Sequence, residues 1–154
     1  MTRIALLGDL DRAYVTHRAL EAVAGLLPGA VHAEVDPEAA DPAVAPLACR
    51  LVGERRAVTC VPGTRLAAIC GTAPFSGFHF CSYGLSGGAV ARLEAEGAVI
   101  AAHAPDAGVE AFELPAHPFF VATLFQPQMG ALEGELHPLV AAFVEEAAGV
   151  RVDG

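Results

Sequence analysis

Two residues in one short segment have side chains suited to acid–base chemistry. His79 and Cys81 alternate in FHFCSYG, residues 78 to 84, so in a strand both side chains point to the same face. A nearby imidazolium lowers the pKa of a thiol, and such a pair can form a reactive thiolate. The structural alternative is that the cysteine is buried in the core and the histidine is hydrogen-bonded within the strand.

Three further residues are candidates for proton transfer. They are Cys49 in PLACRLV, Glu113 in ELPAHP and His17 near the N-terminus. Each also has a structural interpretation. The cysteine can be a buried thiol, the glutamate part of a turn, and the histidine a solvated residue of a capped helix. Together with His79 and Cys81, these residues form the predicted catalytic set.

Candidate ligand-binding residues lie at three places. Asp9 and Tyr14 follow the apolar segment RIALLG, and ligands of open α/β sheets collect at the carboxyl ends of strands, beside helix N-termini. Ordinary helix capping by the aspartate is the alternative. Gln126 and Gln128, in FQPQ, offer amide donors and acceptors to a ligand. Tyr83 completes the set.

The composition argues against several functional classes. The chain of 154 residues has a formal charge of −9, nine scattered arginines and no lysine. Nucleic-acid binding requires a basic stripe, and binding to an acidic membrane surface is disfavoured for the same reason. No apolar run reaches about 18 residues, and the N-terminus does not resemble a secretory signal. We therefore expect a cytoplasmic protein that binds neither nucleic acid nor membrane.

The four cysteines do not form a metal-binding pattern. Cys49, Cys60, Cys70 and Cys81 include no CxxC pair. A structural zinc site needs closely paired ligands, and a disulfide framework needs an oxidising compartment. We expect neither a metal nor a cofactor.

The hydrophobic pattern predicts one α/β domain over residues 1–154. LACRLV (47–52) and AVTCVP (57–62) are predicted as strands joined by GERR. Strands are also expected at RIALLG, FHFCSYG, AVIAAH, GVEAFEL and FFVATLF, and helices after residue 12, over 86–96 and in LHPLVAAFVEEAAG. The order of elements indicates a mixed sheet flanked by helices, mostly parallel, because RIALLG is a continuous apolar run.

Several segments resemble the class I glutamine amidotransferase domain of CTP synthases. ELPAHPFFVATLFQPQ, followed by HPLVAAFVEEA, is similar to that family's E-L-x-x-H-P-x-F-V-A-x-Q-F-H-P-E and P-L-F-x-x-F-V. RIALLGD and RAYVTHRAL resemble the family's first strand and helix, and FHFCSYGLS its H-R-Y-E-V-N segment. PLACRLV, PGTRLAA, YG and HPFFVATLF also recur in a group related to the C-terminal region of CTP synthase. The resemblance implies a shortened, flavodoxin-like amidotransferase fold.

The same resemblance implies that the family's chemistry is missing. In the family a Cys on a sharp turn attacks the glutamine amide, a His activates the Cys, and a Glu orients the His. Gln126 and Gln128 stand at the His and Glu positions, and a carboxamide is not a base. Around Cys70, AAICGT has Ala68 where the G-x-C-x-G turn needs glycine, and Ser82 stands where the family has a substrate-binding arginine. We interpret the chain as lacking the nucleophile turn.

Two functions remain open. The first is a small enzyme that reuses the amidotransferase cleft for acid–base chemistry of the lyase, isomerase or hydrolase type, acting on a small polar metabolite in specialised biosynthesis. The second is a non-catalytic module that binds a ligand or a partner chain. Loss of central sheet elements exposes a sheet edge, so we expect a homodimer in either case. An enzyme should bring at least two of the predicted catalytic residues together in one pocket.

Overall fold

The computed structural model describes residues 15, 18–19, 22–23, 44–46, 53–80 and 83–149. The chain divides into two compact units. The first comprises Met1–Ala40 and Pro127–Gly154, and the second comprises Asp41–Gln126.

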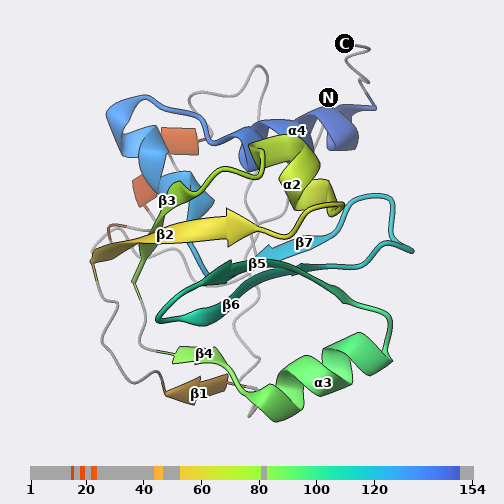
Figure 1. The fold of residues 1–154 in the computed structure, drawn as a ribbon. Helices are drawn as coiled ribbons and strands as arrows, with labels where there is room; N and C mark the ends of the chain where they lie inside the picture. The colour runs from red at the N-terminus through yellow and green to blue at the C-terminus, as the bar shows by residue number, and fades with distance from the viewer. Residues whose placement is uncertain are drawn as a thin grey trace. The chain divides into compact units, whose positions relative to one another are not determined.

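A five-stranded sheet forms the frame of the second unit. Its order is β3-β2-β5-β6-β7 (Figure 1), and each neighbouring pair is antiparallel. The strands are β2 (Glu54–Cys60), β3 (Phe75–His79), β5 (Val99–Ala104), β6 (Gly108–Glu113) and β7 (Val121–Thr123). A two-stranded sheet pairs β1 (Val44–Pro46) with β4 (Tyr83–Leu85), also antiparallel.

The α/β class is confirmed, but the prediction of a mostly parallel sheet is wrong for the described strands. Parallel neighbours need a crossover of about a dozen residues or more, whereas residues 105 to 107 alone join β5 to β6. The parallel interpretation relied on RIALLG, which lies outside the described residues. A buried apolar run is equally compatible with an antiparallel strand that is covered on both faces.

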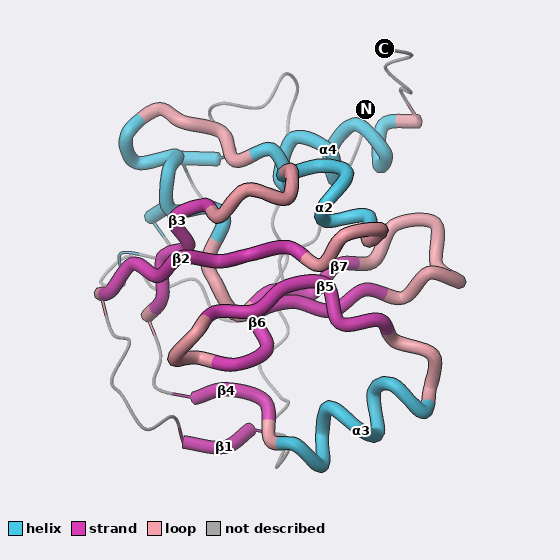
Figure 2. Tube along the Cα trace, viewed as in Figure 1, coloured by secondary structure: helices cyan, strands magenta, loops and turns pink. Residues whose placement is uncertain are grey.

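Two helices connect strands of the second unit (Figure 2). Helix α2 (Arg65–Cys70) lies between β2 and β3 in the chain, and α3 (Gly87–Ala95) lies between β4 and β5. Each begins with a hydroxyl cap. Thr64 Oγ1 accepts from the Ala67 N–H at 3.1 Å, and Ser86 Oγ accepts from the Ala89 N–H at 3.2 Å. The pattern of residues 86–96 predicted α3 correctly. The six residues of α2 are too few to show a helical period, so α2 was not predicted.

Three strand predictions differ from the structure. FHFCSYG was expected to be one strand, but β3 ends at His79, and Tyr83 begins β4 in the other sheet. GERR was expected to be a turn, but Glu54–Cys60 is one continuous strand, and Gly53, directly before it, is a turn residue with a φ of 79°. FFVATLF was expected to be a full strand, but β7 has 3 residues. The residues before it belong to a turn that Leu114 N–H and Phe120 O close at 3.3 Å.

The described part of the first unit consists mainly of two helical segments. These are the 3-10 helix η1 (Pro127–Glu133) and α4 (Pro138–Ala148). The predicted C-terminal helix is confirmed. It starts at Pro138 behind the N-cap His137 and ends at Gly149, whose φ is 67°. None of the described helices is both long enough and apolar enough to cross a membrane.

The sheet core of the second unit requires a glycine in β3. A Cβ at Gly77 would lie 2.6 Å from Val58 Cγ2 and 2.9 Å from Phe125 Cβ. Phe125 is 1% exposed, and its ring meets the Phe75 ring edge-on at a centroid distance of 5.2 Å. The Phe125 side chain therefore occupies the space that a side chain at Gly77 would need.

We expect Gly77→Ala to destabilise the protein by about 1–3 kcal/mol, because the added methyl overpacks this contact. Gly88→Ala is the matched control. Gly88 lies in α3 with no atom within 4 Å of a Cβ built there. The same methyl should therefore stabilise the protein by about 0.4–1 kcal/mol. Urea unfolding measures both changes, and a Gly77→Ala variant as stable as the wild type would contradict the packing.

The N-cap of α4 makes stability depend on pH. Burial lowers the pKa of His137 below its usual value of 6.5, and its Nδ1 must be unprotonated to accept from the Leu139 N–H at 3.2 Å. Below pH 6.5, His137 therefore binds a proton more readily in the unfolded chain than in the folded chain. Its contribution to the free energy of unfolding is complete above pH 6.5 and is lost as the pH falls towards the lowered pKa. We expect His137→Asn, which caps without titrating near neutrality, to remove this loss. Urea midpoints measured between neutral and mildly acidic pH provide the comparison, and parallel pH profiles of the two proteins would refute it.

Candidate functional site

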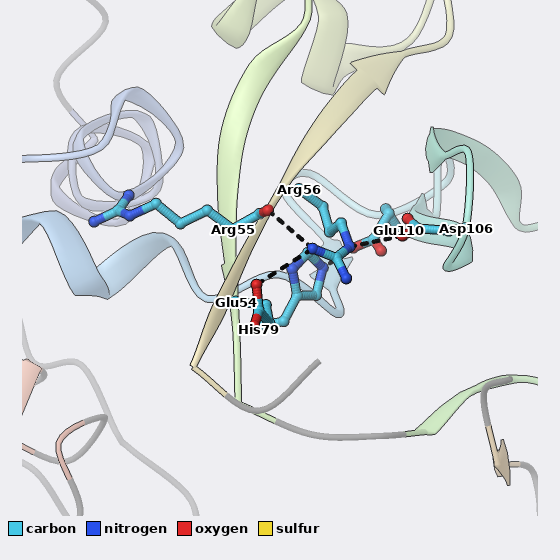
Figure 3. Close-up of polar contacts among 6 residues, drawn as sticks. All are labelled: Glu54, Arg55, Arg56, His79, Asp106 and Glu110. Atoms are coloured by element: carbon cyan, nitrogen blue, oxygen red, sulfur yellow. Dashed lines mark hydrogen bonds and ion pairs between the residues drawn. The ribbon is translucent and has the colours of Figure 1, made fainter. Parts of the chain in front are cut away.

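A buried histidine–glutamate pair is the main polar feature of the second unit. His79 is the last residue of β3 and Glu110 lies in β6. They are 1% and 0% exposed, and His79 Nε2 lies 2.8 Å from Glu110 Oε2 (Figure 3). His79 was one of the predicted catalytic residues. Its partner Glu110 was not.

The sheet must curl to bring this pair together. β3 and β6 are separated by β2 and β5, which in a flat sheet would place them about 14 Å apart, at roughly 4.8 Å between strands. A hydrogen bond of 2.8 Å between their side chains requires the face that carries them to be concave. The pair thus joins strands that share no backbone ladder.

Strand register explains why both side chains face inward. Glu54 pairs with His79, and Arg56 pairs with Gly77, so these four residues lie on one face of β2 and β3. Within β3, Gly77 and His79 are buried, whereas Ser76 is exposed and Phe78 is half-buried. The side chain of His79 therefore points into the unit.

An irregular register places Glu110 opposite His79. The ladder between β5 and β6 shifts between Ile100 and Ala102 and again between Ala102 and His103. Glu110 and Ala111 are consecutive and both buried, which a regular two-residue alternation does not produce on a half-exposed strand. Such a β-bulge redirects a side chain.

Three more charged residues surround the pair. Arg56 Nε lies 2.8 Å from Asp106 Oδ2, and Arg56 Nη1 lies 3.5 Å from Glu54 Oε2. Figure 3 shows the guanidinium between these two carboxylates. Exposed ion pairs contribute only about 0–1 kcal/mol, so they mainly order the side chains. We call Glu54, Arg56, His79, Asp106 and Glu110 the polar cluster.

The pair is not saturated by its own hydrogen bond. His79 Nδ1 and Glu110 Oε1 are buried and have no hydrogen-bond partner among the described residues. An unsatisfied buried polar group costs about 1–3 kcal/mol, and native structures contain few of them. Each member therefore keeps one atom able to bind another group.

This arrangement can perform acid–base chemistry. With Glu110 ionised and the imidazole neutral, the carboxylate only accepts, so the ring proton lies on Nε2 and is donated to Glu110. His79 Nδ1 then carries a lone pair that can take up a proton, and Glu110 can stabilise the imidazolium that forms.

Glu113, the second predicted catalytic residue that is described, caps a helix. Its Oε1 accepts from the Arg65 N–H at 2.9 Å and its Oε2 accepts from the Leu66 N–H at 3.2 Å. These are the first N–H groups of α2, where a carboxylate also complements the helix dipole. No hydrogen bond or ion pair joins Glu113 to His79 within the described residues, so the structure does not bring the two together.

The remaining predicted site residues lie apart or outside the described residues. Tyr83, in β4, is 53% exposed, and Gln128 is half-buried in η1 of the first unit. The Gln126 N–H donates to the carbonyl of Phe78 at 2.8 Å, so Gln126 lies beside the end of β3. Asp9, Tyr14, His17, Cys49 and Cys81 fall outside the described part of the chain.

Two cysteines, Cys60 and Cys70, lie within the described residues, and neither has the environment of a reactive thiol. Burial raises the pKa of the Cys60 thiol in β2, which disfavours its thiolate. Cys70 is the last residue of α2 and is followed by Gly71. Within the described residues, no group of three or more His, Cys, Asp and Glu side chains is arranged to hold a metal ion.

Sequence analysis missed Glu110. The available signal was the presence of two carboxylates in the otherwise apolar strand GVEAFEL. Glutamate is rarely buried unless it is paired, so an acidic residue in a core strand indicates a partner. The pattern alone does not say which residue that partner is.

In fold, the chain is similar to glutamine amidotransferase domains. The chain superposes on the glutaminase domain of Trypanosoma brucei CTPS with bound acivicin, with a TM-score of 0.65 and 17% identity, over 97% of this chain and 72% of that chain. It also superposes on a GMP synthase protein from Thermoplasma acidophilum, with a TM-score of 0.64 and 10% identity, over 97% and 95% of the two chains. At these identities the likeness shows the fold.

In sequence, part of the chain is similar to CTP synthases. The chain is 37% identical over 87 residues to the CTP synthase of Chelativorans sp., covering 56% of this chain and 16% of that protein. It is 37% identical over 95 residues to the CTP synthase of Chloroflexus aurantiacus, covering 61% and 17%. The match thus spans about a sixth of the length of these relatives. No protein-family profile matches the chain. The predicted resemblance to the CTP synthase amidotransferase domain is confirmed.

We expect His79 and Glu110 to be energetically coupled. Either His79→Leu or Glu110→Leu alone leaves a buried polar partner, at a cost of about 1–3 kcal/mol. The double variant removes both groups and should be more stable than the sum of the single effects, with a coupling energy of about 0.5–3 kcal/mol.

Glu113→Gln supplies the matched control for this cycle, because Glu113 is also a buried carboxylate of β6 but contacts α2. Its effect should add to that of His79→Leu within about 0.5 kcal/mol. Urea unfolding of the six proteins completes both cycles. Additive behaviour of His79 and Glu110 would show that the pair does not interact.

Proposed function

We propose that this glutamine amidotransferase-like protein does not hydrolyse glutamine, and that it catalyses acid–base chemistry on a small polar metabolite in specialised biosynthesis. The reaction would be of the lyase, isomerase or hydrolase type. The observation that carries the proposal is the buried His79–Glu110 pair, in which Nδ1 of the imidazole has no partner among the described residues. The non-catalytic module and the homodimer stay open as predictions.

The residues at the family's catalytic positions support the loss of glutaminase chemistry. Gln126 and Gln128 stand where the family has His and Glu, and a carboxamide neither accepts a proton near neutral pH nor stabilises an imidazolium. Cys70 ends a helix, whereas a nucleophile turn places its residue between a strand and the start of a helix. Cys70 therefore lacks the position that activates such a nucleophile.

The geometry of the pair supports a general base. Glu110 fixes the ring through Nε2, so proton transfer falls to Nδ1. Exclusion of water strengthens the electrostatic stabilisation of the imidazolium by the carboxylate. Because His79 is only 1% exposed, substrate binding requires the groups that cover it to move, as in enzymes whose sites open and close around a substrate.

The proposal predicts a reaction that depends on His79 and is not glutamine hydrolysis. The purified protein is incubated with glutamine, and separately with a metabolite extract in D2O. We expect no ammonia release above background, and deuterium incorporation or conversion of a metabolite in the extract, detected by mass spectrometry. His79→Gln should abolish that change, because an amide cannot replace the imidazole base.

His103→Gln is the control for this experiment, since His103 is an exposed histidine of β5 and lies outside the polar cluster. It should retain the full activity. Ammonia release that disappears in Cys70→Ala would overturn the first half of the proposal. A metabolite change that persists in His79→Gln, or the absence of any change, would overturn the second half.

A further inference from the structure

Two side-chain contacts bridge the same parts of the curved sheet. The buried contact joins His79 of β3 to Glu110 of β6. The second joins Arg56 of β2 to Asp106, with Nε lying 2.8 Å from Oδ2. β2 is the strand paired with β3, and Asp106 stands in the turn that leads from β5 into β6. The second contact therefore runs alongside the first.

Strand register places Arg56 on the face of the sheet that carries the pair. Glu54 is directly opposite His79, and Arg56, two residues further along β2, shares the face of Glu54. Directly opposite residues have Cβ atoms about 4.5–5.5 Å apart, and a diagonal neighbour is within reach of a long side chain. Glu54 is therefore beside His79, and the Arg56 side chain is long enough to extend over the imidazole.

The side chains of the polar cluster differ in exposure in a regular order. Those of His79 and Glu110 are each 1% exposed, and that of Arg56 is 23% exposed. Its two carboxylate partners, Asp106 and Glu54, are 47% and 55% exposed. The guanidinium is therefore more accessible than the pair, and its partners are more accessible still. Figure 3 shows these five side chains gathered in one cluster.

The ion pairs of Arg56 are of a kind that breaks readily. The contact with Glu54 is 3.5 Å long, and both carboxylates are about half exposed. Ion pairs in contact with water are weak, because water solvates each charge and salt screens their attraction. The hydrogen bond between His79 and Glu110 is shielded from water. The Arg56 side chain can therefore move away while the buried pair stays intact.

We propose that Arg56, held by Glu54 and Asp106, is a gate that closes access to His79. With both ion pairs formed, the guanidinium covers the imidazole. When they break, the ring becomes accessible to a reactant. This inference rests on the proposed function, because it names the residue whose movement that function requires. Arg56 acts on access to the ring and takes no part in proton transfer.

Reaction of His79 with diethyl pyrocarbonate, measured on the full chain, tests the inference. The reagent acylates unprotonated imidazole nitrogens, and mass spectrometry of the peptides gives the rate for each histidine. The exposed His103 of β5 is the internal reference. Raising NaCl from about 0.01 M to about 1 M shortens the Debye length from about 30 Å to about 3 Å. We expect this change to raise the His79 to His103 rate ratio of the wild type about two- to fivefold.

Three variants locate the gate. Arg56→Gln removes the guanidinium, so it should raise the rate ratio about fivefold or more and abolish its dependence on salt. Asp106→Asn breaks one ion pair and should raise the ratio about two- to fivefold. Arg55→Gln is the matched control, because Arg55 is exposed and belongs to the opposite face of β2. Its carbonyl, which accepts from Arg56 Nη1 at 3.3 Å, is unchanged in this variant, and the ratio should not change.

The results that overturn the inference are specific. They are a ratio that stays unchanged in both Arg56→Gln and Asp106→Asn, an equal rise in Arg55→Gln, or a wild-type ratio that salt does not raise. Cys60, which is buried in β2, shows whether a variant has opened as a whole. If iodoacetamide modifies Cys60 of Arg56→Gln as fast as in urea, the ratio in Asp106→Asn and the salt dependence of the wild type decide instead.

The two proposals can fail separately. A gate that opens in these experiments, in a protein without any His79-dependent reaction, removes the proposed function and keeps the gate. A His79-dependent reaction in a protein whose rate ratio is the same in the wild type and in Arg56→Gln keeps the acid–base function and removes the gate.

Discussion

The hydrogen bond between His79 Nε2 and Glu110 Oε2 is the contact on which the second unit depends. It spans 2.8 Å between strands that two other strands separate in the sheet. A flat sheet would hold the two strands too far apart for this contact. The hydrogen bond therefore forms only because the inner face of the sheet is concave. The curl is supported by the β-bulge in the ladder of β5 and β6 and by Gly77, where β3 has no side chain and Phe125 fills the space.

Within the described part of the chain, one strand supplies both buried carboxylates, and they have different roles. Glu110 reaches the imidazole and leaves one oxygen unpaired, whereas both oxygens of Glu113 accept backbone N–H groups of α2. The turn after β6 reinforces this anchor, because the Arg65 side chain donates to the carbonyl of Pro118 and lies over the Phe119 ring at 5.3 Å. Glu113 therefore holds the N-terminus of α2, whereas Glu110 keeps one oxygen without a hydrogen-bond partner among the described residues.

Local patterns predicted the elements that depend on local interactions. The amphipathic pattern, the Pro138 start and the Gly149 end of α4 could be read from the sequence, and so could the presence of a helix over 86–96, where α3 lies. His79 could be selected as a polar residue in an aromatic strand. Strand direction was misjudged because an apolar run does not distinguish a parallel strand from a covered antiparallel one.

The partners of the buried carboxylates could not be predicted in the same way. Glu110 meets a residue 31 positions away, and Glu113 caps a helix 48 positions away. Both contacts depend on sheet order and curl, which a single sequence does not encode in any local period. The resemblance to CTP synthase directed attention to Gln126 and Gln128, at positions where the family's chemistry was expected. It gave no indication of the pair in β3 and β6.

The protonation of the His79 ring tests the central contact most directly. Nitrogen-15 NMR distinguishes the two tautomers and reports exchange of the ring proton with solvent. We expect a ring protonated at Nε2, with a slowly exchanging proton donated to Glu110 and an unprotonated Nδ1. A proton on Nδ1 with Nε2 unprotonated, or a ring proton that exchanges as fast as that of the exposed His103, would contradict it.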